Sequence, residues 1–335
     1  MLRLVLRRLL SLPIQIFGLI TLVFFLTRMI PGDPAYALAG GQATDAQIER
    51  IRADLGLDQP LIVQFGIYLK GLLLGDWGTS LQTSSPVIED LLRRLPATLL
   101  LMGGSLLVIV IVAIILLAVT ISRPQGVVRR FVSGYGFFAG VVPDFWIGLG
   151  LISLLYVPFG IGASPNGQLD GRIFVPNVTG VGLFDAILAS DPYATTNAFM
   201  HLFLPVLTLV IVYLAPIIRI MTVVSREAAA SDFVRYADSW GISPLRRVRY
   251  ILRYTAPQLT TVLASTTVFL LGGAVLVETV FSWGGLGQYA VNAVTRSDYA
   301  AVQGFVLVAG VFTALVYLIN DVLHFAIDPQ LRKAS

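Results

Sequence analysis

The feature that most constrains this chain is a series of apolar stretches, each long enough to cross a bilayer. Six are expected to span the membrane, at residues 9–30, 97–121, 131–157, 201–223, 257–281 and 303–325. About 20 apolar residues in a helix cross the hydrocarbon core. Only 13% of the 335 residues are charged, against about 25% in soluble domains. The sequence therefore predicts an all-α polytopic membrane protein with six transmembrane helices.

The first apolar stretch follows three arginines, an arrangement that also occurs in cleaved signal peptides. Its apolar part, residues 9–27, is longer than the roughly 7–15 residues of a signal-peptide core. The tripeptide Ala35-Tyr36-Ala37 resembles a cleavage site, but it follows Arg28 and a PGDP turn. We therefore expect a retained first span, with a removed signal peptide as the alternative.

Arginine is distributed unevenly among the loops. Three arginines precede the first stretch, three lie in 122–130 and six lie in 224–256, whereas 158–200 and 282–302 hold one each. Short cytoplasmic loops carry an excess of Lys and Arg. The pattern predicts that both termini and the 224–256 loop are cytoplasmic. It also accounts for the net charge of +4 without a nucleic-acid partner.

Two segments are expected on the opposite, extracytoplasmic side. Residues 31–96 are predicted to form a helical cap, because Asp45 begins a run with helical apolar spacing, Gly56 suits a helix end and Pro60 begins a second apolar stretch. Residues 159–198 are predicted to be an outer insertion with short β-like stretches such as 173–175. Residues 1–30 then form the N-terminus and first helix, and residues 97–335 form the membrane core.

Asp144 is the most deeply placed charge by count, about 14 residues into the third stretch. Ionisable residues inside a membrane usually face protein or water. Asp144, with Phe145 and Trp146, is therefore a candidate for lining a pathway, and Pro143 is expected to loosen the helix there. The alternative is that Asp144 is a structural partner for an arginine on another helix.

Glu278 lies near the outer end of the fifth stretch, before the glycine-rich sequence SWGGLGQ that begins with Ser282 and Trp283. Glu278 and Trp283 are candidates for an outer gate, in which the carboxylate holds a re-entrant loop closed. The alternative is that Glu278 simply hydrogen-bonds the loop backbone, and this structural role is favoured.

The stretch FVRYADSWGISPLRRVRYILRY, residues 233–254, holds five arginines between two apolar segments. Its spacing predicts a short helix that Gly241 ends, followed by a restart at Ser243-Pro244. Phe233, Ala237 and Trp240 fall at i, i+4 and i+7 and share a face. Val234 and Tyr236 flank that face, and Arg235 and Asp238 lie at its sides. Such a helix either enters a groove on a partner protein or lies on lipid.

This stretch resembles the cytoplasmic coupling loop of ABC importer permeases. The family pattern is Glu-Ala-Ala, three residues, Gly; aligned on Gly241, the first three positions are Arg235-Tyr236-Ala237, so the last alanine and the glycine match. Other segments, including RMIPGDP (28–34), LGLDQPLIVQFGIYLKGLLLGDWGTSL (55–81), ETVFSWGGLGQYAVNAVTRSDYAAVQG (278–304) and LINDVLHFAIDPQLR (318–332), are similar to the first permease of the dipeptide, oligopeptide and nickel importers.

The resemblance implies the type I ABC importer permease fold in a bacterial inner membrane, with residues 233–238, 240 and 241 coupling to an ATPase. The implied partners are a second permease, two ATPase subunits that bind ATP and Mg, an extracytoplasmic binding protein and a peptide. This chain is expected to hold no cofactor of its own and to be a non-catalytic subunit of the transporter. It is not the ATPase, because neither lysine belongs to a GxxxxGK[ST] phosphate loop. The alternatives are transport of nickel chelates or glutathione, an ATP-independent channel or secondary transporter, or a membrane anchor or scaffold.

Overall fold

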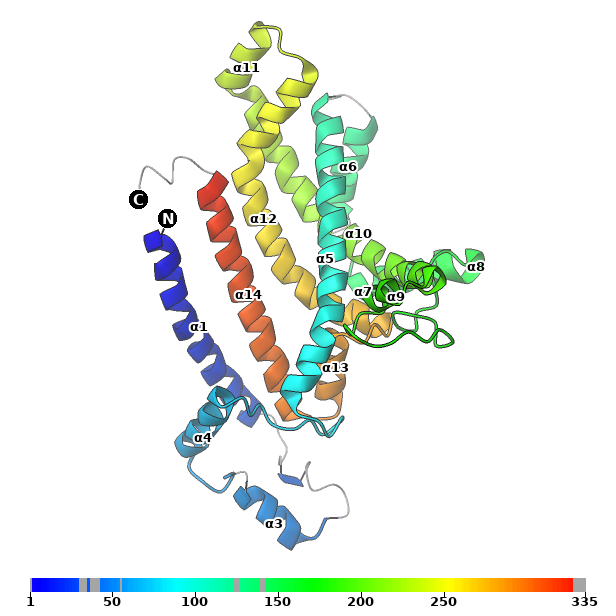
Figure 1. Ribbon diagram of the computed structural model, residues 1–335. Helices are drawn as coiled ribbons and strands as arrows, with labels where there is room; N and C mark the ends of the chain where they lie inside the picture. Colours follow the sequence, from blue (N-terminus) through cyan, green and yellow to red (C-terminus); the bar gives the residue numbers. More distant parts are fainter. Residues whose placement is uncertain are drawn as a thin grey trace.

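The computed structural model describes residues 2–29, 35–36, 43–54, 56–122, 127–138 and 142–327. Its longer elements are all helices, joined by turns and loops (Figure 1). They are α1 (Leu2–Met29), α3 (Asp45–Asp54), α4 (Leu61–Leu73), α5 (Val87–Ser122), α6 (Val127–Phe138), α7 (Asp144–Leu151), η1 (Ile152–Tyr156), α8 (Val157–Phe159), α9 (Gly182–Leu188), α10 (Pro192–Ala230), α11 (Asp232–Ser239), α12 (Pro244–Val280), α13 (Leu286–Thr295) and α14 (Tyr299–Ile327).

Five described helices, namely α1, α5, α10, α12 and α14, are long and apolar enough to cross a membrane. α10 packs against α5 and α12, while α14 packs against α12 and α1. The largest core cluster lies where α5, α10 and α12 meet and includes Leu101, Leu209 and Leu270, all fully buried. The all-helical polytopic fold predicted from the sequence is confirmed.

The expectation of one continuous helix over residues 131–157 is wrong. The segment divides into α6 and a 16-residue apolar unit, Asp144–Phe159, that contains the π-helical turn η1. Pro143 supplies the reason, since proline has no N–H to donate and disfavours helical geometry in the residue before it. Asp144 therefore begins a helix instead of lying in the middle of one.

Different helices lie at the two ends of the molecule. α11 lies at one end, and the first residues of α1 and the last residues of α14 point toward that end (Figure 1). α3 and α4 lie at the other end (Figure 1). In the cap segment, Gly56 after α3 has a φ of +63°, and Pro60 occupies the N-cap position of α4.

The insertion at 159–198 contains no strand, so the β-like pattern of residues 173–175 did not indicate a sheet. Two hydrogen bonds connect the insertion to the turn that follows α12. The Gly167 amide donates to the Phe281 carbonyl at 3.0 Å, and the Gln168 side chain donates to the Trp283 carbonyl at 3.2 Å.

Some segments used in the sequence analysis lie outside the described residues. They are residues 30–34 with the PGDP motif, residues 37–42 and 55 of the cap, residues 123–126 of the second arginine-bearing loop, residues 139–141 of the third apolar stretch and the C-terminal residues 328–335.

Candidate functional site

The first candidate site is α11, which connects the ends of α10 and α12. Ser231 is its N-cap residue, and the Ser231 hydroxyl donates to the Ala228 carbonyl at 2.6 Å. The helix stops before Gly241, whose φ of +68° lies in the left-handed region that favours glycine. Ser243 then occupies the N-cap position of α12 and Pro244 its first turn. The turn therefore has the helix–stop–helix geometry expected from the sequence.

One side of α11 is held against the rest of the chain by Val234, which is 1% exposed. Val234 packs in a small cluster with Ala228 of α10 and Ile251 of α12. This cluster links α11 to both long helices, so α11 is positioned by packing as well as by its two flanking turns.

The other side of α11 presents aromatic rings. Phe233, Tyr236 and Trp240 are 61%, 66% and 73% exposed. The Tyr236 and Trp240 rings lie 6.1 Å apart, and the Phe233 ring lies 5.5 Å from that of Tyr250 on α12. Ala237 is only partly exposed, so the outward face is formed by these three aromatic residues, with Ala237 at its edge.

The charged residues of α11 pair within the chain. Asp238 lies 3.4 Å from Arg247 of α12, and Arg235 lies 3.8 Å from Asp232 of its own first turn. All four side chains are more than one-third exposed, so these pairs add little stability.

The second candidate site surrounds Glu278, which is completely buried near the end of α12. One carboxylate oxygen accepts the Thr98 hydroxyl proton at 2.6 Å; the other accepts the Gly287 and Gln288 amides at 2.7 and 3.1 Å. The Thr98 hydroxyl in turn accepts the Leu286 amide at 2.8 Å. Glu278 thus joins α5, α12 and the start of α13.

Trp283 and two glycines complete this site. The Trp283 indole donates to the Ala97 carbonyl at 3.0 Å. A Cβ at Gly285 would overlap the Glu278 carboxylate, and one at Gly287 would overlap the backbone of Val275. The glycines of SWGGLGQ therefore allow close approach of backbone to carboxylate, which is the arrangement that the structural role of Glu278 requires.

The third candidate site joins three helices around Asp144. The Tyr213 hydroxyl of α10 donates to the Asp144 carboxylate at 2.9 Å, so its bonded partner is a tyrosine and not the arginine considered from the sequence. Asp144 is in the first turn of α7, where the helix dipole favours a negative charge. A Cβ on Gly273 of α12 would overlap both polar groups, so glycine permits this contact.

The neighbouring aromatic residues of α7 have different environments. Trp146 is 64% exposed, whereas Phe145 is partly buried. A cavity of about 580 Å³ lies beside Tyr213, between α6, α10 and α12. Its lining includes Tyr213, Pro216, Arg219, Thr261, Ser265 and Phe269, and does not include Asp144 or Trp146. The cavity offers a guanidinium and several hydroxyls among apolar side chains.

Sequence reasoning did not identify Tyr213, Gly273 or Thr98 as site residues. A hydroxyl-bearing residue inside an otherwise apolar run is a weak signal that could have marked Tyr213. Gly273 follows another glycine, Gly272, and nothing in the sequence distinguishes the two. Their surroundings differ, because a Cβ on Gly272 would meet no atom within 4 Å.

Comparison with known proteins gives matches along almost the whole chain. Residues 109–333 match the family "Binding-protein-dependent transport system inner membrane component", and residues 1–102 match "Binding-prot-dependent transport system membrane comp, N-term". The "Probable D,D-dipeptide transport system permease protein DdpB" of Escherichia coli (strain K12) is 38% identical, over 97% of this chain and 96% of that protein.

Two further relatives extend this result. The "Di/tripeptide transport system permease protein DppB" of Pseudomonas aeruginosa (strain UCBPP-PA14) is 35% identical, over 99% of both chains. The "Dipeptide transport system permease protein DppB" of Escherichia coli (strain K12) is 31% identical, also over 99% of both chains. The chain therefore belongs to the family of inner membrane components of binding-protein-dependent transport systems, the ABC importer permeases that its motifs resemble.

Proposed function

We propose that this chain is the permease subunit of an ATP-driven importer for short peptides, in which it forms half of the translocation pathway. Separate ATPase subunits drive it, with ATP and Mg bound there, and it works with a second permease and an extracytoplasmic binding protein. The proposed cargo rests on the relatives, whose names specify D,D-dipeptides, di- and tripeptides, and dipeptides.

The observation that carries the proposal is the exposed aromatic face of α11. Aromatic side chains that desolvate in a partner's pocket often dominate the binding energy of an interface. Because Val234 anchors the opposite side of α11 in the chain's own cluster, force applied to the aromatic face reaches α10 and α12. A helix lying on lipid, the alternative, requires no such anchor.

The coupling test uses variants that change this face. Trp240→Ala and Phe233→Ala are each expected to insert normally and to lose about 2 kcal/mol of ATPase binding, which weakens affinity about 30-fold. Ala237→Trp and Gly241→Asp are expected to insert and fail to couple. At Gly241, a Cβ has open space but a left-handed backbone, at a cost of about 1–2 kcal/mol.

The measurements are co-purification of the ATPase subunits and ATP hydrolysis in reconstituted vesicles. Leu245→Ala is the matched control, because Leu245 is 80% exposed but lies on the first turn of α12. Full coupling in all four variants of α11 and the turn after it would show that the helix lies on lipid. Uptake of dipeptides, glutathione and a nickel chelate, compared in cells that lack other importers, tests the cargo.

We also propose that both chain termini and α11 face the cytoplasm of a bacterial cell. The sequence has no cysteine, so single cysteines report topology directly. Cysteines at Asn166 and at Phe174, which is 92% exposed, should react with an impermeant thiol reagent from outside intact cells. Asp191 is less suitable, since it caps α10 by accepting the Tyr193 and Ala194 amides. If these cysteines are labelled only after lysis, the orientation is opposite to the one proposed.

The cavity beside Tyr213 is our candidate for this chain's part of the pathway. Arg219 and the hydroxyls of Thr261 and Ser265 line it, and a guanidinium pairs well with a carboxylate such as a peptide's C-terminus. Arg219→Gln should lower uptake of a free-carboxylate dipeptide more than uptake of its C-terminal amide. An equal loss for both peptides would exclude this role.

A further inference from the structure

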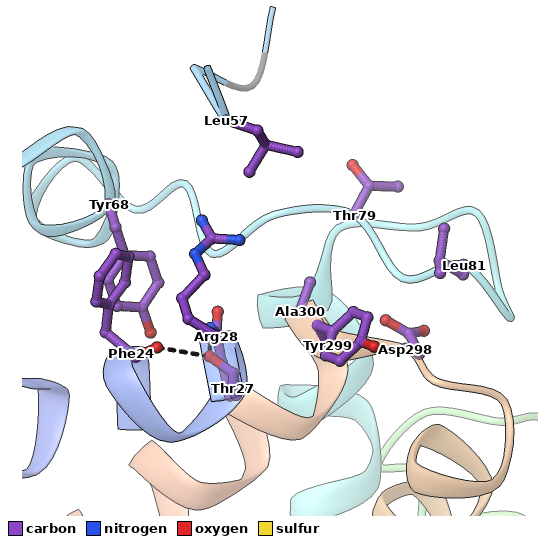
Figure 2. A pocket seen from close by; sticks show the side chains of 11 residues that line it. Phe24, Thr27, Arg28, Leu57, Tyr68, Thr79, Leu81, Asp298, Tyr299 and Ala300 are labelled. Atoms are coloured by element: carbon purple, nitrogen blue, oxygen red, sulfur yellow. Dashed lines mark hydrogen bonds between the residues drawn. The ribbon is translucent and has the colours of Figure 1, made fainter. Parts of the chain in front are cut away.

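A separate pocket of about 170 Å³ lies at the outer end of α1, where α4 and the first turn of α14 approach it. In Figure 2 the Arg28 side chain extends into this space, with Phe24 and Tyr68 on one side and Thr79 on the other. None of the peptide-transport roles proposed above uses this pocket.

The positive charge of Arg28 is not neutralised within the described part of the chain. Its guanidinium carbon lies 5.2 Å from the centre of the Phe24 ring, a cation–π contact. Its Nε is buried and has no hydrogen-bond partner, and no described carboxylate forms an ion pair with Arg28. Buried polar groups in native proteins are nearly always hydrogen-bonded, so this donor indicates a missing acceptor.

Tyr68 of α4 supplies a second unpaired group at the same pocket. Its ring packs against Phe24, with centroids 5.5 Å apart, and its hydroxyl is buried without a hydrogen-bond partner. Burial raises the pKa of Tyr68 to about 12, so the hydroxyl stays protonated and can donate. Two donors from different helices therefore line one small space.

Asp298, the carboxylate in the pocket wall, does not satisfy these donors. It is completely buried, and its oxygens accept the Ser80 hydroxyl at 2.6 Å and the Gln82 and Ala301 amides at 3.3 and 3.2 Å. The groups of the pocket that lack partners are thus donors, and the complementary ligand is an anion.

The surroundings of the pocket indicate where such an anion comes from. Arg28 lies in the last turn of a predicted span, the depth at which basic side chains meet headgroups. The helices that flank the pocket expose apolar side chains outward: Met29 at 78%, Ile62 at 72%, Leu73 at 80% and Leu74 at 75%. An anion that also carries acyl chains fits both features.

We propose that this pocket binds the phosphate of a phospholipid headgroup. Arg28 pairs with the phosphate, as guanidinium groups do in a bidentate manner, the Tyr68 hydroxyl donates a second hydrogen bond, and the exposed apolar side chains of α4 contact the acyl chains. The bound lipid joins α4 to α1 and so fixes the position of α4 within the outer cap.

The test uses the full-length permease, purified in detergent and stripped of lipid, with thermal unfolding as the readout. A short-chain phosphatidylglycerol is titrated against wild type, Arg28→Gln and Tyr68→Phe. Wild type should be stabilised saturably; Arg28→Gln should bind at least about tenfold more weakly, as expected for loss of a charged hydrogen bond, and Tyr68→Phe about threefold more weakly. Arg172→Gln, an exposed arginine elsewhere, is the matched control and should behave as wild type.

Two further ligands separate the sources of the anion. A diacylglycerol with the same chains tests the acyl chains alone, and inorganic phosphate tests the anion alone; neither should reproduce the stabilisation. If inorganic phosphate matches the phospholipid, the site holds a free anion and the lipid assignment is wrong. If diacylglycerol matches it, the phosphate has no role.

Equal lipid affinity in wild type and Arg28→Gln also overturns the proposal. If Arg28→Gln does not yield a monodisperse protein, Arg28→Lys and Tyr68→Phe decide the question. Arg28→Lys keeps the charge and removes the planar pair of donors, and Tyr68→Phe removes the hydroxyl. The proposal therefore requires weaker lipid binding in Arg28→Lys and in Tyr68→Phe. Unchanged affinity in either one refutes the assigned geometry.

Discussion

The contact between Asp144, Tyr213 and Gly273 gives the sharpest mutational test of how the central helices fit together. Gly272 and Gly273 are adjacent in α12, and a Cβ would meet the Asp144 carboxylate and the Tyr213 hydroxyl at the second position only. Replacing each glycine by alanine therefore makes the same chemical change in two different environments.

The magnitude follows from what the new methyl group displaces. Alanine instead of glycine within a helix contributes about 0.5–1 kcal/mol of stability at either position. At Gly273 the methyl group separates the two polar side chains, which costs a hydrogen bond to a charged group, about 1.5–3 kcal/mol. Gly273→Ala should therefore be about 2 kcal/mol less stable than Gly272→Ala, or about 3 °C lower in Tm for a chain of 335 residues.

The assay is thermal unfolding of the purified variants, with peptide uptake measured in parallel. A third variant, Tyr213→Phe, removes the hydroxyl, so adding Gly273→Ala to it should cost at least about 1 kcal/mol less than in wild type. If Gly272→Ala and Gly273→Ala unfold at the same temperature, or if Tyr213→Phe gives no relief, the three residues do not form the contact described.

Two further outcomes are expected, one at Asp144 and one at the buried carboxylate of Glu278. Asp144→Asn keeps an acceptor for Tyr213 and loses about 0.3–1 kcal/mol of helix-dipole interaction, so the amount of protein in the membrane, measured by immunoblot, should stay normal. A fall in uptake alone would favour the pathway role of Asp144. Loss of the protein from the membrane would favour the structural role. In Glu278→Gln the amide oxygen can keep the Gly287 and Gln288 amides, but the NH₂ then faces the Thr98 hydroxyl, which loses its acceptor. Glu278→Ala leaves three donors unpaired. The free energy of unfolding should therefore fall in the order wild type, Gln, Ala, by about 1–3 kcal/mol per lost partner, and Tm should fall in the same order. A gate without a structural role would instead give normal Tm and altered uptake for Glu278→Gln.

The features that could be predicted from the sequence are those specified by residues close together in the chain. Gly241, Ser243 and Pro244 define the stop and restart around α11 because each acts through its own backbone geometry. Gly56 and Pro60 do the same in the cap. The long apolar helices are equally local, since hydrophobicity over about 20 residues decides them.

The contacts that could not be predicted join residues far apart in sequence. Thr98 and Glu278 are 180 positions apart, and Tyr213 and Asp144 are 69 positions apart. Neither pair can be predicted from a single sequence, because the sequence does not specify which faces of α5, α7, α10 and α12 point toward one another. The break at Pro143 was missed for a different reason: proline often occurs inside membrane helices, so its presence alone did not require a stop.

α12 connects three of the sites within one continuous helix. It begins at Pro244 beside α11, carries Gly273 at the Asp144 contact and places Glu278 near its other end. At about 1.5 Å per residue its 37 residues extend about 55 Å. The Ile251 packing ties its first turns to Val234 of α11, and α10 ties α11 to Tyr213 in the same way through Ala228. Both partners of the Tyr213–Gly273 contact therefore lie on the two helices that flank α11, and along α12 this contact lies between α11 and Glu278.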